Sequence, residues 1–312
     1  MLDDFFFTRL GFKATPEKTI VLPKYKGSTL RGGFGHAFKK STCVADDSDC
    51  DDCMLADNCL YNYVFNTPLP EDSEMMKKYP YAPHPFLIEP PEEKKREYTE
   101  EDTIEFNLVL IGRVIDQLSY FVYAFEKLGE LGLGKKRGNY ELDQVRFDPP
   151  QGESASIYSD GSLEGIDTTM HASDLNVPQE DALTFRLRTP MRLKYEGELV
   201  GDLEFHVLLR NLLRRTSLLS FFHCDHEMDV EFSGLIEQAK EVEKVEDDLQ
   251  WYDWERYSGR QDKWIKMGGL TGEVTFRGDM DPFRKLLALG EYLHVGKSTA
   301  FGMGRYKIVE SQ

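Results

Sequence analysis

Two glycine-rich stretches decide the fold: G-L-G-K-K-R-G at Gly132–Gly138 and G-K-S-T-A-F-G-M-G at Gly296–Gly304. Each follows an amphipathic helical pattern, at Val114–Leu128 and Pro282–Tyr292, and each precedes a short strand pattern. Before each of these helices the sequence predicts one strand, then a helix, then a pair of strands. The same order therefore occurs twice, as in a repeat of the split β-α-β type. We predict an α+β protein of two tandem ferredoxin-like domains; one large α+β domain is the alternative.

The stretch 151–181 separates the two copies. It is rich in Gly, Ser and Asp and poor in large apolar residues, which is typical of a linker or an exposed hairpin. We predict an N-terminal domain over residues 1–150 with a Cys-rich insertion at 43–59, and a C-terminal domain with a glycine-rich loop over residues 182–312.

The charge is strongly acidic and unevenly distributed. With 38 Lys+Arg and 55 Asp+Glu among 312 residues, the chain carries −17, which argues against a phosphate-rich partner. Three segments, 44–59, 151–185 and 227–256, together hold −21, so the remainder carries +4. The charged content excludes a membrane protein, and acids in the first ten residues argue against an export signal. We therefore expect a cytoplasmic protein that can still bind nucleic acid.

One helical segment combines a titratable group with cations. The sequence from Tyr25 to Lys40 leads from a loop into a helix that carries three glycines in its first turns. Glycines there indicate a close approach of the backbone to another strand or to a ligand. His36 is surrounded by Arg31, Lys39 and Lys40. An imidazole can move protons near neutral pH, and cations can stabilise a phosphorane-like transition state. A surface or packing role for the histidine is the alternative.

The segment Gly296-Lys297-Ser298 looks like the end of an NTPase phosphate-binding loop. That motif requires a glycine at position 291, where this chain has Glu291. The NTPase motif also follows a strand, whereas this segment follows a helical pattern. We therefore exclude an NTPase.

Four of the five cysteines fall in one acidic insertion with a C-x-x-C at its centre. In a reducing compartment, four such thiols suit a structural zinc, or less readily an iron–sulfur cluster, and free thiols remain the alternative. The predicted ligands are Cys43, Cys50, Cys53 and Cys59.

Several stretches resemble one known family. They are L-R-G-G-F-G-H-A-F-K-K at 30–40 with the Cys cluster after it, and L-H-V-G-K-S-T-A-F-G-M-G-R-Y at 293–306. Thr189–Lys194, Trp251–Ser258 and Gly268–Gly278 add to the similarity. Together they resemble the CRISPR-associated pre-crRNA-processing endoribonucleases of the repeat-associated mysterious protein (RAMP) superfamily.

The resemblance implies tandem ferredoxin-like domains and metal-independent cleavage of CRISPR repeat RNA, without a catalytic cofactor. The 2′-hydroxyl would attack the adjacent phosphate and leave a 2′,3′-cyclic phosphate and a 5′-hydroxyl. His36 matches the family's histidine in or near the first helix, with Tyr25 as its candidate partner and Lys39 or Lys40 as the cation. The candidate RNA-binding residues lie on or beside the glycine-rich segments: Arg31, Lys135, Lys136, Arg137, Gly296, Lys297, Gly302, Gly304 and Arg305.

Two alternatives remain at this stage. The first is a non-catalytic crRNA-binding subunit of a CRISPR effector complex, which would associate with other effector subunits. The second is a structural metalloprotein whose Cys cluster docks a protein partner. Cleavage, or RNA binding without cleavage, would separate these functions.

Overall fold

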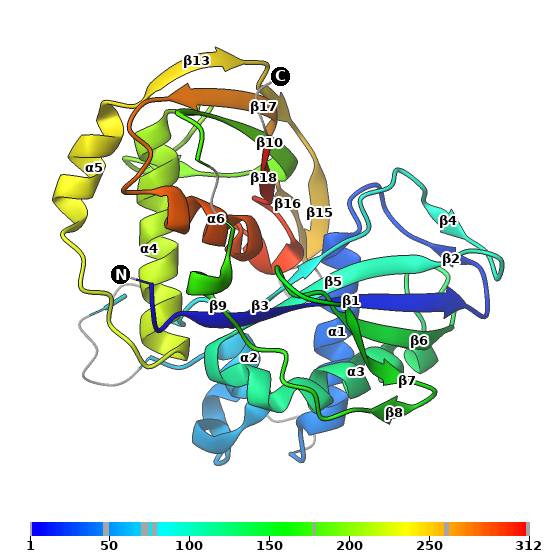
Figure 1. Cartoon of the computed structure of the whole chain (residues 1–312). Helices are drawn as coiled ribbons and strands as arrows, with labels where there is room; N and C mark the ends of the chain where they lie inside the picture. The colour runs from blue at the N-terminus through cyan, green and yellow to red at the C-terminus, as the bar shows by residue number, and fades with distance from the viewer. Residues whose placement is uncertain are drawn as a thin grey trace. The chain divides into compact units, whose positions relative to one another are not determined.

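The computed structural model describes residues 2–45, 50–69, 75–76, 80–176, 179–258 and 262–309. The chain forms two compact units (Figure 1). The N-terminal unit comprises residues 6–170 and 222–225, and the C-terminal unit comprises residues 1–5, 171–221 and 226–312. The main boundary falls between Met170 and His171, inside the stretch that the sequence marks as a linker or hairpin.

The N-terminal unit is an antiparallel sheet with helices on one face. Its central strands run in the order β3-β5-β1-β6. Their bounds are β1 (Phe6–Pro16), β3 (Phe86–Glu89), β5 (Ile104–Ile111) and β6 (Tyr140–Phe147), and the helices are α1 (Gly27–Thr42), α2 (Leu60–Asn66) and α3 (Leu118–Leu131).

Alternation along β1 explains how this sheet forms its core. Leu10, Phe12 and Ala14 are buried, because every second residue of a strand points to the same face. The Phe12 ring lies 4.8 Å from Phe125 of α3 and stacks on Phe106 of β5 at 5.2 Å. The opposite face is mixed: it carries Arg9 and Lys13 of β1 beside the buried Phe7.

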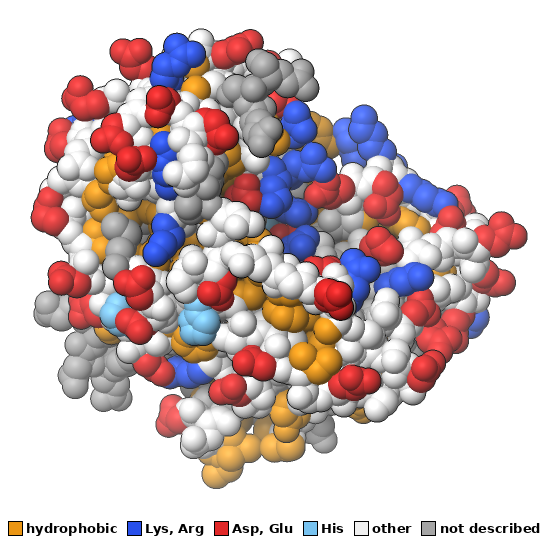
Figure 2. Space-filling view, viewed as in Figure 1, with side chains coloured by type: hydrophobic (Ala, Val, Ile, Leu, Met, Phe, Trp, Pro, Cys, Tyr) orange, Lys and Arg blue, Asp and Glu red, His pale blue; other side chains and the backbone are white. Residues whose placement is uncertain are grey.

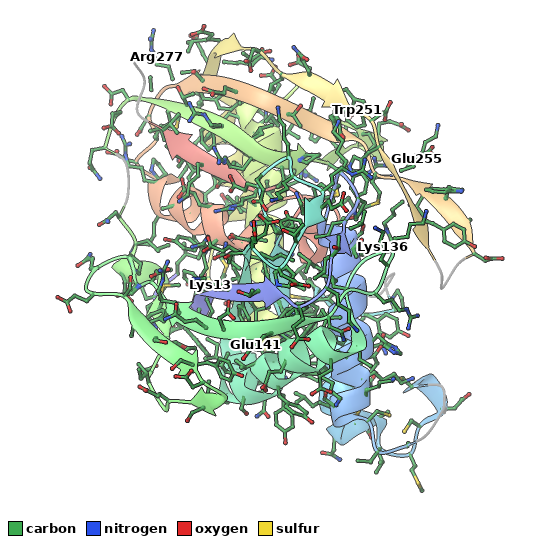
Figure 3. All side chains as sticks on the ribbon, turned by 90° about the vertical axis from the view of Figure 1, so that its right-hand side faces the viewer. Lys13, Lys136, Glu141, Trp251, Glu255 and Arg277 are labelled. Atoms are coloured by element: carbon green, nitrogen blue, oxygen red, sulfur yellow. The ribbon has the colours of Figure 1, made fainter. Side chains whose placement is uncertain are left out.

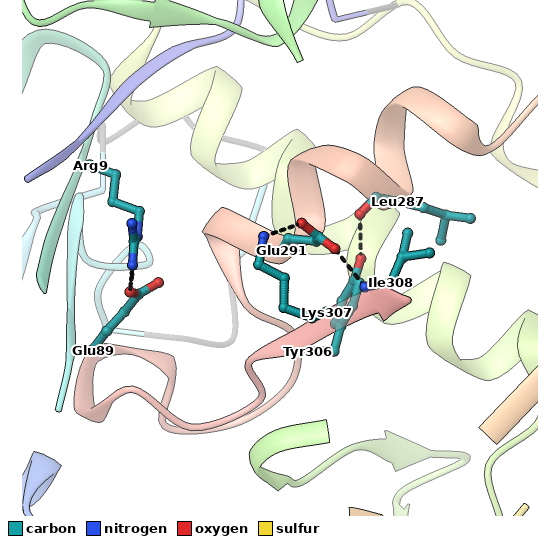
Figure 4. A network of polar contacts seen from close by, with 7 residues as sticks. All are labelled: Arg9, Glu89, Leu287, Glu291, Tyr306, Lys307 and Ile308. Carbon is teal, nitrogen blue, oxygen red and sulfur yellow. Dashed lines mark hydrogen bonds and ion pairs between the residues drawn. The ribbon is translucent and has the colours of Figure 1, made fainter. Parts of the chain in front are cut away.

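An ion pair crosses that mixed face. The Arg9 guanidinium lies 2.8 Å from the carboxylate of Glu89, whose side chain is only 1% exposed (Figure 4). Because β5 lies between the strands that carry them, this pair ties β1 to β3 across the sheet.

The C-terminal unit repeats this plan. Its strands run in the order β13-β17-β10-β18. Their bounds are β10 (Ala182–Met191), β13 (Glu243–Asp247), β17 (Gly269–Arg277) and β18 (Tyr306–Val309), and the helices are α4 (Phe205–His223), α5 (Phe232–Lys240) and α6 (Arg284–Leu293). Phe276 of β17 packs its ring 5.8 Å from Phe185 and 5.4 Å from Phe205, which joins the sheet to α4.

The two sheets share one topology. In each, the four strands alternate with α1 and α3, or with α4 and α6, in the order β-α-β-β-α-β, while α2 and α5 are additional helices. The spatial order of the strands is second, third, first, fourth. This is the split β-α-β arrangement of a ferredoxin-like domain. The predicted α+β class with two tandem ferredoxin-like domains is therefore confirmed.

The chain has two features beyond this repeated plan, and the first is a hairpin of the kind that the sequence offered for the stretch 151–181. Residues 155–163 form a hairpin, β7 (Ala155–Ser159) and β8 (Ser162–Leu163), that extends the N-terminal sheet from β6. Strand-like patterns at 249–256 and 269–276 in the sequence predict that these two segments pair as a hairpin. Only β14 (Gln250–Tyr252) does so, and β15 (Glu255–Ser258) leaves the sheet to pair with β16 (Lys263–Lys266).

No helix within the described ranges is long and apolar enough to cross a membrane.

Candidate functional site

The glycines of α1 serve two different purposes. A Cβ at Gly33 would lie 2.8 Å from Leu128 of α3, and one at Gly35 would lie 3.1 Å from Phe65 of α2. These two glycines let α1 pack closely against its neighbouring helices. A Cβ at Gly32 would meet nothing within 4 Å, and this residue is exposed. Packing does not require Gly32, so its bare backbone remains open to a ligand.

Gly32, His36 and Lys40 form one exposed face of α1, which we call the α1 face. They are spaced four residues apart, so they lie one above another on the helix. All three are exposed. Lys39 is half-buried, and its ammonium lies 5.7 Å from the centre of the Tyr61 ring of α2. The structure therefore brings His36 and Lys40 together on the surface, while Lys39 is engaged with an aromatic ring.

Tyr25 lies at the other end of α1. The sequence pattern predicts a helix from Thr29, but the helix begins two residues earlier, at Gly27, and no side chain caps it. Gly27 and His36 are about 13 Å apart along the axis, at 1.5 Å per residue. Burial raises the pKa of the Tyr25 phenol above its ordinary range, so the hydroxyl keeps its proton at neutral pH. Tyr25 can donate a proton but cannot serve as a base there.

The start of α1 is anchored by a buried lysine. Lys26 is 2% exposed and donates a hydrogen bond from Nζ to the carbonyl of Glu93. Burial lowers the pKa of this ammonium, and the nearby Glu93 carboxylate acts in the opposite direction. We assign Lys26 a structural role, because its side chain is enclosed.

Arg31 lies against aromatic residues. Its guanidinium carbon lies 4.9 Å from the centre of the Phe65 ring, and one of its nitrogens is 3.4 Å from Nε2 of His84. Both Arg31 and His84 are half-buried. In the sequence His84 stands between Pro83 and Pro85, which indicates a loop, and nothing there connects it with Arg31. A contact between residues 53 positions apart has no local sequence signal.

The first glycine-rich turn, residues 132–138, uses its backbone amides within the chain. Leu133 donates to the carbonyl of Gly138 at 2.8 Å, and Gly138 donates back at 3.1 Å. The amide of Lys135 donates to the carbonyl of Val21 at 3.2 Å. Gly134 has a φ of +76°, and a Cβ there would lie 2.4 Å from the same carbonyl. These glycines pack the turn against β2 (Ile20–Val21), so phosphate contacts would come from side chains.

Those side chains are available. Lys135, Lys136 and Arg137 are all exposed. Lys136, marked in Figure 3, has a carboxylate oxygen of Glu97 at 4.0 Å, at the limit of an ion pair. We call these three residues the basic turn.

The second glycine-rich turn, residues 296–304, is also held by internal hydrogen bonds. Gly296, Gly302 and Gly304 have φ values of +95°, +81° and +75°. A Cβ at Gly304 would lie 1.9 Å from the carbonyl of Val295, and one at Gly296 would lie 2.5 Å from that of Arg192. Any side chain at these two positions would collide with backbone, so the glycines fix the path of the turn.

The cations at this turn differ in exposure. Lys297 is exposed, whereas Arg305 is only 9% exposed. The amide of Lys297 donates to the carbonyl of Arg192 at 2.9 Å. Lys194 and Arg210 are exposed as well, and the Arg210 guanidinium lies 5.9 Å from the ring of Tyr195. Sequence reasoning missed this group of cations, although Arg192 and Lys194 stand in the recognised stretch Thr189–Lys194.

The open face of the C-terminal sheet has the wrong charge for phosphate. A hollow of about 680 Å³ lies there. Its charged lining consists of two arginines and four acids: Arg186, Arg277, Glu246, Asp247, Asp248 and Glu273. Figure 2 shows acidic side chains bordering α5 and β13, whereas Lys and Arg gather around β10 and β15. Within this unit, the hollow would repel phosphate, and the Lys and Arg side chains around β10 and β15 would attract it.

The cysteines do not form the predicted metal centre. Among the described residues, no three His, Cys, Asp or Glu side chains gather as metal ligands would. Cys43 follows α1 and its thiol donates to the carbonyl of Ala45 at 3.1 Å, while Cys50, Cys53 and Cys59 are half-buried around two short 3₁₀ turns. Residues 46–49 of the insertion lie outside the described ranges. The expected structural zinc is therefore not supported, because the four thiols, all within the described ranges, do not gather into one ligand group.

Two family models match the chain in succession. The model of the AF_1859 N-terminal domain matches residues 5–172, and the model of the CRISPR-associated endoribonuclease Cas6 matches residues 185–306. An uncharacterized protein of Archaeoglobus fulgidus is 21% identical over 294 residues, which are 92% of each chain.

Solved structures have the same fold. Thermus thermophilus Cas6 is 15% identical with a TM-score of 0.57, over 98% of this chain and 99% of its own. A Cas6 product complex is 18% identical with a TM-score of 0.59, over 97% and 99%. A chain of a partial Cas6-RT-Cas1–Cas2 complex is 15% identical with a TM-score of 0.61, over 98% of this chain but 46% of its own.

Two ferredoxin-like units with structured glycine-rich turns define a protein of the RAMP class. The chain belongs to the family that carries the AF_1859 N-terminal domain, a family of Cas6-like RAMP proteins. It has the Cas6 endoribonuclease fold over its whole length.

Proposed function

We propose that this protein is an endoribonuclease that cuts CRISPR repeat RNA by metal-independent attack of a 2′-hydroxyl on the adjacent phosphate. The observation that carries the proposal is the α1 face, where Gly32, His36 and Lys40 are exposed on one side of a helix. The match to the Cas6 family model and the Cas6 fold support the same activity.

Each group has a defined task in this reaction. His36 accepts the proton of the 2′-hydroxyl, and the 2′-oxygen forms a bond to phosphorus. The bond from phosphorus to the 5′-oxygen breaks, and that oxygen takes up a proton, which leaves a 2′,3′-cyclic phosphate and a 5′-hydroxyl. Lys40, with Lys39 as the second candidate, stabilises the charge on the pentacoordinate phosphate. Gly32 allows the RNA backbone to approach the helix.

Tyr25 is the candidate donor to the 5′-oxygen. Its raised pKa keeps the phenol protonated, so Tyr25 can act only as a donor, and the same shift makes it a weak acid at neutral pH. Its place before Gly27, which is itself about 13 Å from His36 along the helix axis, is the difficulty with this role. Solvent or Lys40 is the alternative donor, and a Tyr25→Phe variant separates the two cases.

Exposed cations of both units would bind the RNA backbone. They are the basic turn of the N-terminal unit, with Arg31 as a half-buried neighbour of α1, and Lys297, Lys194 and Arg210 of the C-terminal unit. Gly296, Gly302 and Gly304 hold the second turn in shape, and Arg305 is too enclosed to offer a large contact. A processed RNA held in this way can serve as the link to other CRISPR proteins, as the match to a chain of the Cas6-RT-Cas1–Cas2 complex suggests.

The test is cleavage of the cognate repeat RNA in EDTA by the wild type, His36→Ala, Lys40→Ala and Tyr25→Phe. We expect His36→Ala to lose at least 100-fold in rate, since a positioned base contributes about 10²–10⁴-fold. His171→Ala, another exposed histidine, is the matched control and should cut normally. A 2′-deoxy nucleotide at the cut site should abolish cleavage.

Other outcomes assign other functions. Equal rates for the wild type and His36→Ala would remove His36 from the mechanism. Tight binding of the repeat RNA without cleavage by the wild type would favour a non-catalytic crRNA-binding subunit. Loss of activity in EDTA, restored by a divalent ion, would contradict the metal-independent reaction.

A further inference from the structure

The hairpin formed by β15 and β16 presents an aromatic surface. Tyr257 and Trp264 are directly opposite in its register. Their rings lie 5.7 Å apart at 66°, and the two side chains are 52% and 66% exposed. Such exposure is unusual for two large aromatic residues in contact, and it leaves a ring face free for a ligand.

The hairpin is built so that this pair faces outward. Cross-strand partners share a face, so Glu255 and Lys266 lie on the same side as Tyr257 and Trp264. The opposite side carries Arg256, whose guanidinium lies 4.7 Å from the centre of the Phe301 ring. Because Phe301 belongs to the second glycine-rich turn, this contact connects the hairpin to that turn within the C-terminal unit. Figure 3 shows the hairpin extending beyond the sheet near Trp251 and Glu255.

The tyrosine is fixed by its hydroxyl. Tyr257 donates a hydrogen bond to the carboxylate of Asp262 in the turn of the hairpin. That bond orients the ring and leaves the tryptophan face as the larger open surface.

The local charge is opposite to that of the whole chain. Residues 255–266 contain four cations and two acids, a net charge of +2 in a chain of −17. Lys266 shares the face of Trp264 and is exposed, and Lys263, next to Trp264 in sequence but on the opposite face, is exposed as well. An aromatic surface bordered by lysines complements a base and its phosphates, because bases stack on aromatic rings and ammonium groups attract phosphate.

We propose that the β15–β16 hairpin binds single-stranded RNA by stacking an unpaired base on Trp264, with Lys266, on the same face, at a flanking phosphate. The inference rests on the proposed RNA substrate and adds a place where an unpaired nucleotide of that substrate is held.

The test is the affinity for a fluorescein-labelled twelve-residue oligouridylate, followed by fluorescence anisotropy. Stacking contributes about 1–3 kcal/mol per base, so Trp264→Ala should weaken binding about 5- to 150-fold. Trp264→Phe keeps a ring and should retain most of the affinity. Tyr123→Ala removes an aromatic side chain of α3 that is 50% exposed and should bind like the wild type. Thermal melting of each variant shows that it is folded.

A second measurement uses tryptophan emission. The chain has three tryptophans, so a Trp251→Phe, Trp254→Phe double variant leaves Trp264 as the sole tryptophan. Oligouridylate should quench its emission on binding. Unchanged affinity of Trp264→Ala, or no quenching at saturating RNA, would overturn the proposal. So would loss of a bound protein partner by Trp264→Ala with RNA affinity intact, because the hairpin would then dock protein.

Failure of this inference and failure of the proposed function give different results. If the wild type cuts repeat RNA and Trp264→Ala binds oligouridylate normally, the inference is wrong and the nuclease stands. If the wild type does not cut and Trp264→Ala loses the affinity, the hairpin binds RNA in a protein without that activity.

Discussion

The hydroxyl of Thr189 donates a 2.7 Å hydrogen bond to the carbonyl of Gly302 in the second glycine-rich turn. The same oxygen accepts the amide hydrogen of Arg305 at 2.9 Å. Thr189 is 8% exposed, so one buried side chain of β10 satisfies two backbone groups of the turn. The stretch Thr189–Lys194 and the turn, more than a hundred residues apart in sequence, are thus one structural feature.

Thr189→Val should destabilise the protein by about 1–3 kcal/mol, because an isosteric methyl leaves a buried carbonyl and amide without their partner. The free energy of unfolding, from urea titration, checks this. Thr189→Ser keeps the hydroxyl and should cost less. A small loss for Thr189→Val together with a large loss for Thr189→Ser would show that the methyl group, and not the hydrogen bonds, matters.

The turn is also held at its two ends. Lys307 of β18 lies 2.6 Å from the carboxylate of Glu291 in α6, and that carboxylate also accepts the amide hydrogen of Ile308 at 2.6 Å (Figure 4). Tyr306 donates to the carbonyl of Leu287 at 2.7 Å. Glu291 stands where an NTPase loop would need a glycine. Here its carboxylate holds the strand that follows the turn, through Lys307 and the amide of Ile308.

Gly32→Ala should stabilise the protein by about 1 kcal/mol, because alanine is the better helix former and a Cβ there meets nothing within 4 Å. If RNA approaches this backbone, the same variant should cut repeat RNA more slowly. Gly129→Ala in α3 is the control, since its Cβ would lie 2.2 Å from the carbonyl of Tyr140 and should lower stability. A slower Gly32→Ala enzyme that is also less stable would contradict the ligand role.

Replacing Lys135, Lys136 and Arg137 by alanine should weaken RNA binding for all sequences alike. The slope of log K against log salt should fall by about 2–3, because each phosphate contact contributes about 0.7–0.9. A triple alanine variant of Lys127, Lys240 and Lys285 is the control. It removes the same charge from residues that have acidic partners. The same slope in both variants would show that the basic turn contacts no phosphate.

Cys224 should resist alkylation in the folded protein. It is 9% exposed, and burial raises its pKa to about 11, so only about one thiol in a thousand is ionised at pH 8. The four half-buried cysteines of the insertion should react with iodoacetamide first, as mass spectrometry can follow. In urea all five should react. Rapid modification of Cys224 in the native state would contradict its burial.

The repeat, the fold class and most helices were predictable from sequence. Periodicity predicts a strand at 5–14, a helix at 29–41 and a strand at 140–147, which agree with β1, α1 and β6 to within about two residues, because alternation and helical spacing are local properties. The β15–β16 hairpin was not predicted, because residues 249–256 suit a continuous strand and the exchange of partners after Tyr252 depends on tertiary pairing. The zinc prediction is not supported for a similar reason: spacing shows which thiols are near in sequence, not where they point.

The sequence alone determined the two ferredoxin-like units, the glycine-rich turns and the presence of His36 among cations. These features depend on composition and hydrophobic periodicity, which are properties of residues close together in the sequence. The tertiary structure decided which of those residues share a surface. Close contacts to Leu128 and Phe65 assign Gly33 and Gly35 to packing and leave Gly32 open beside His36 and Lys40. Backbone hydrogen bonds occupy amides of both glycine-rich turns, so RNA binding at the turns is left to side chains. This follows from contacts between residues far apart in the sequence, which the sequence alone does not show.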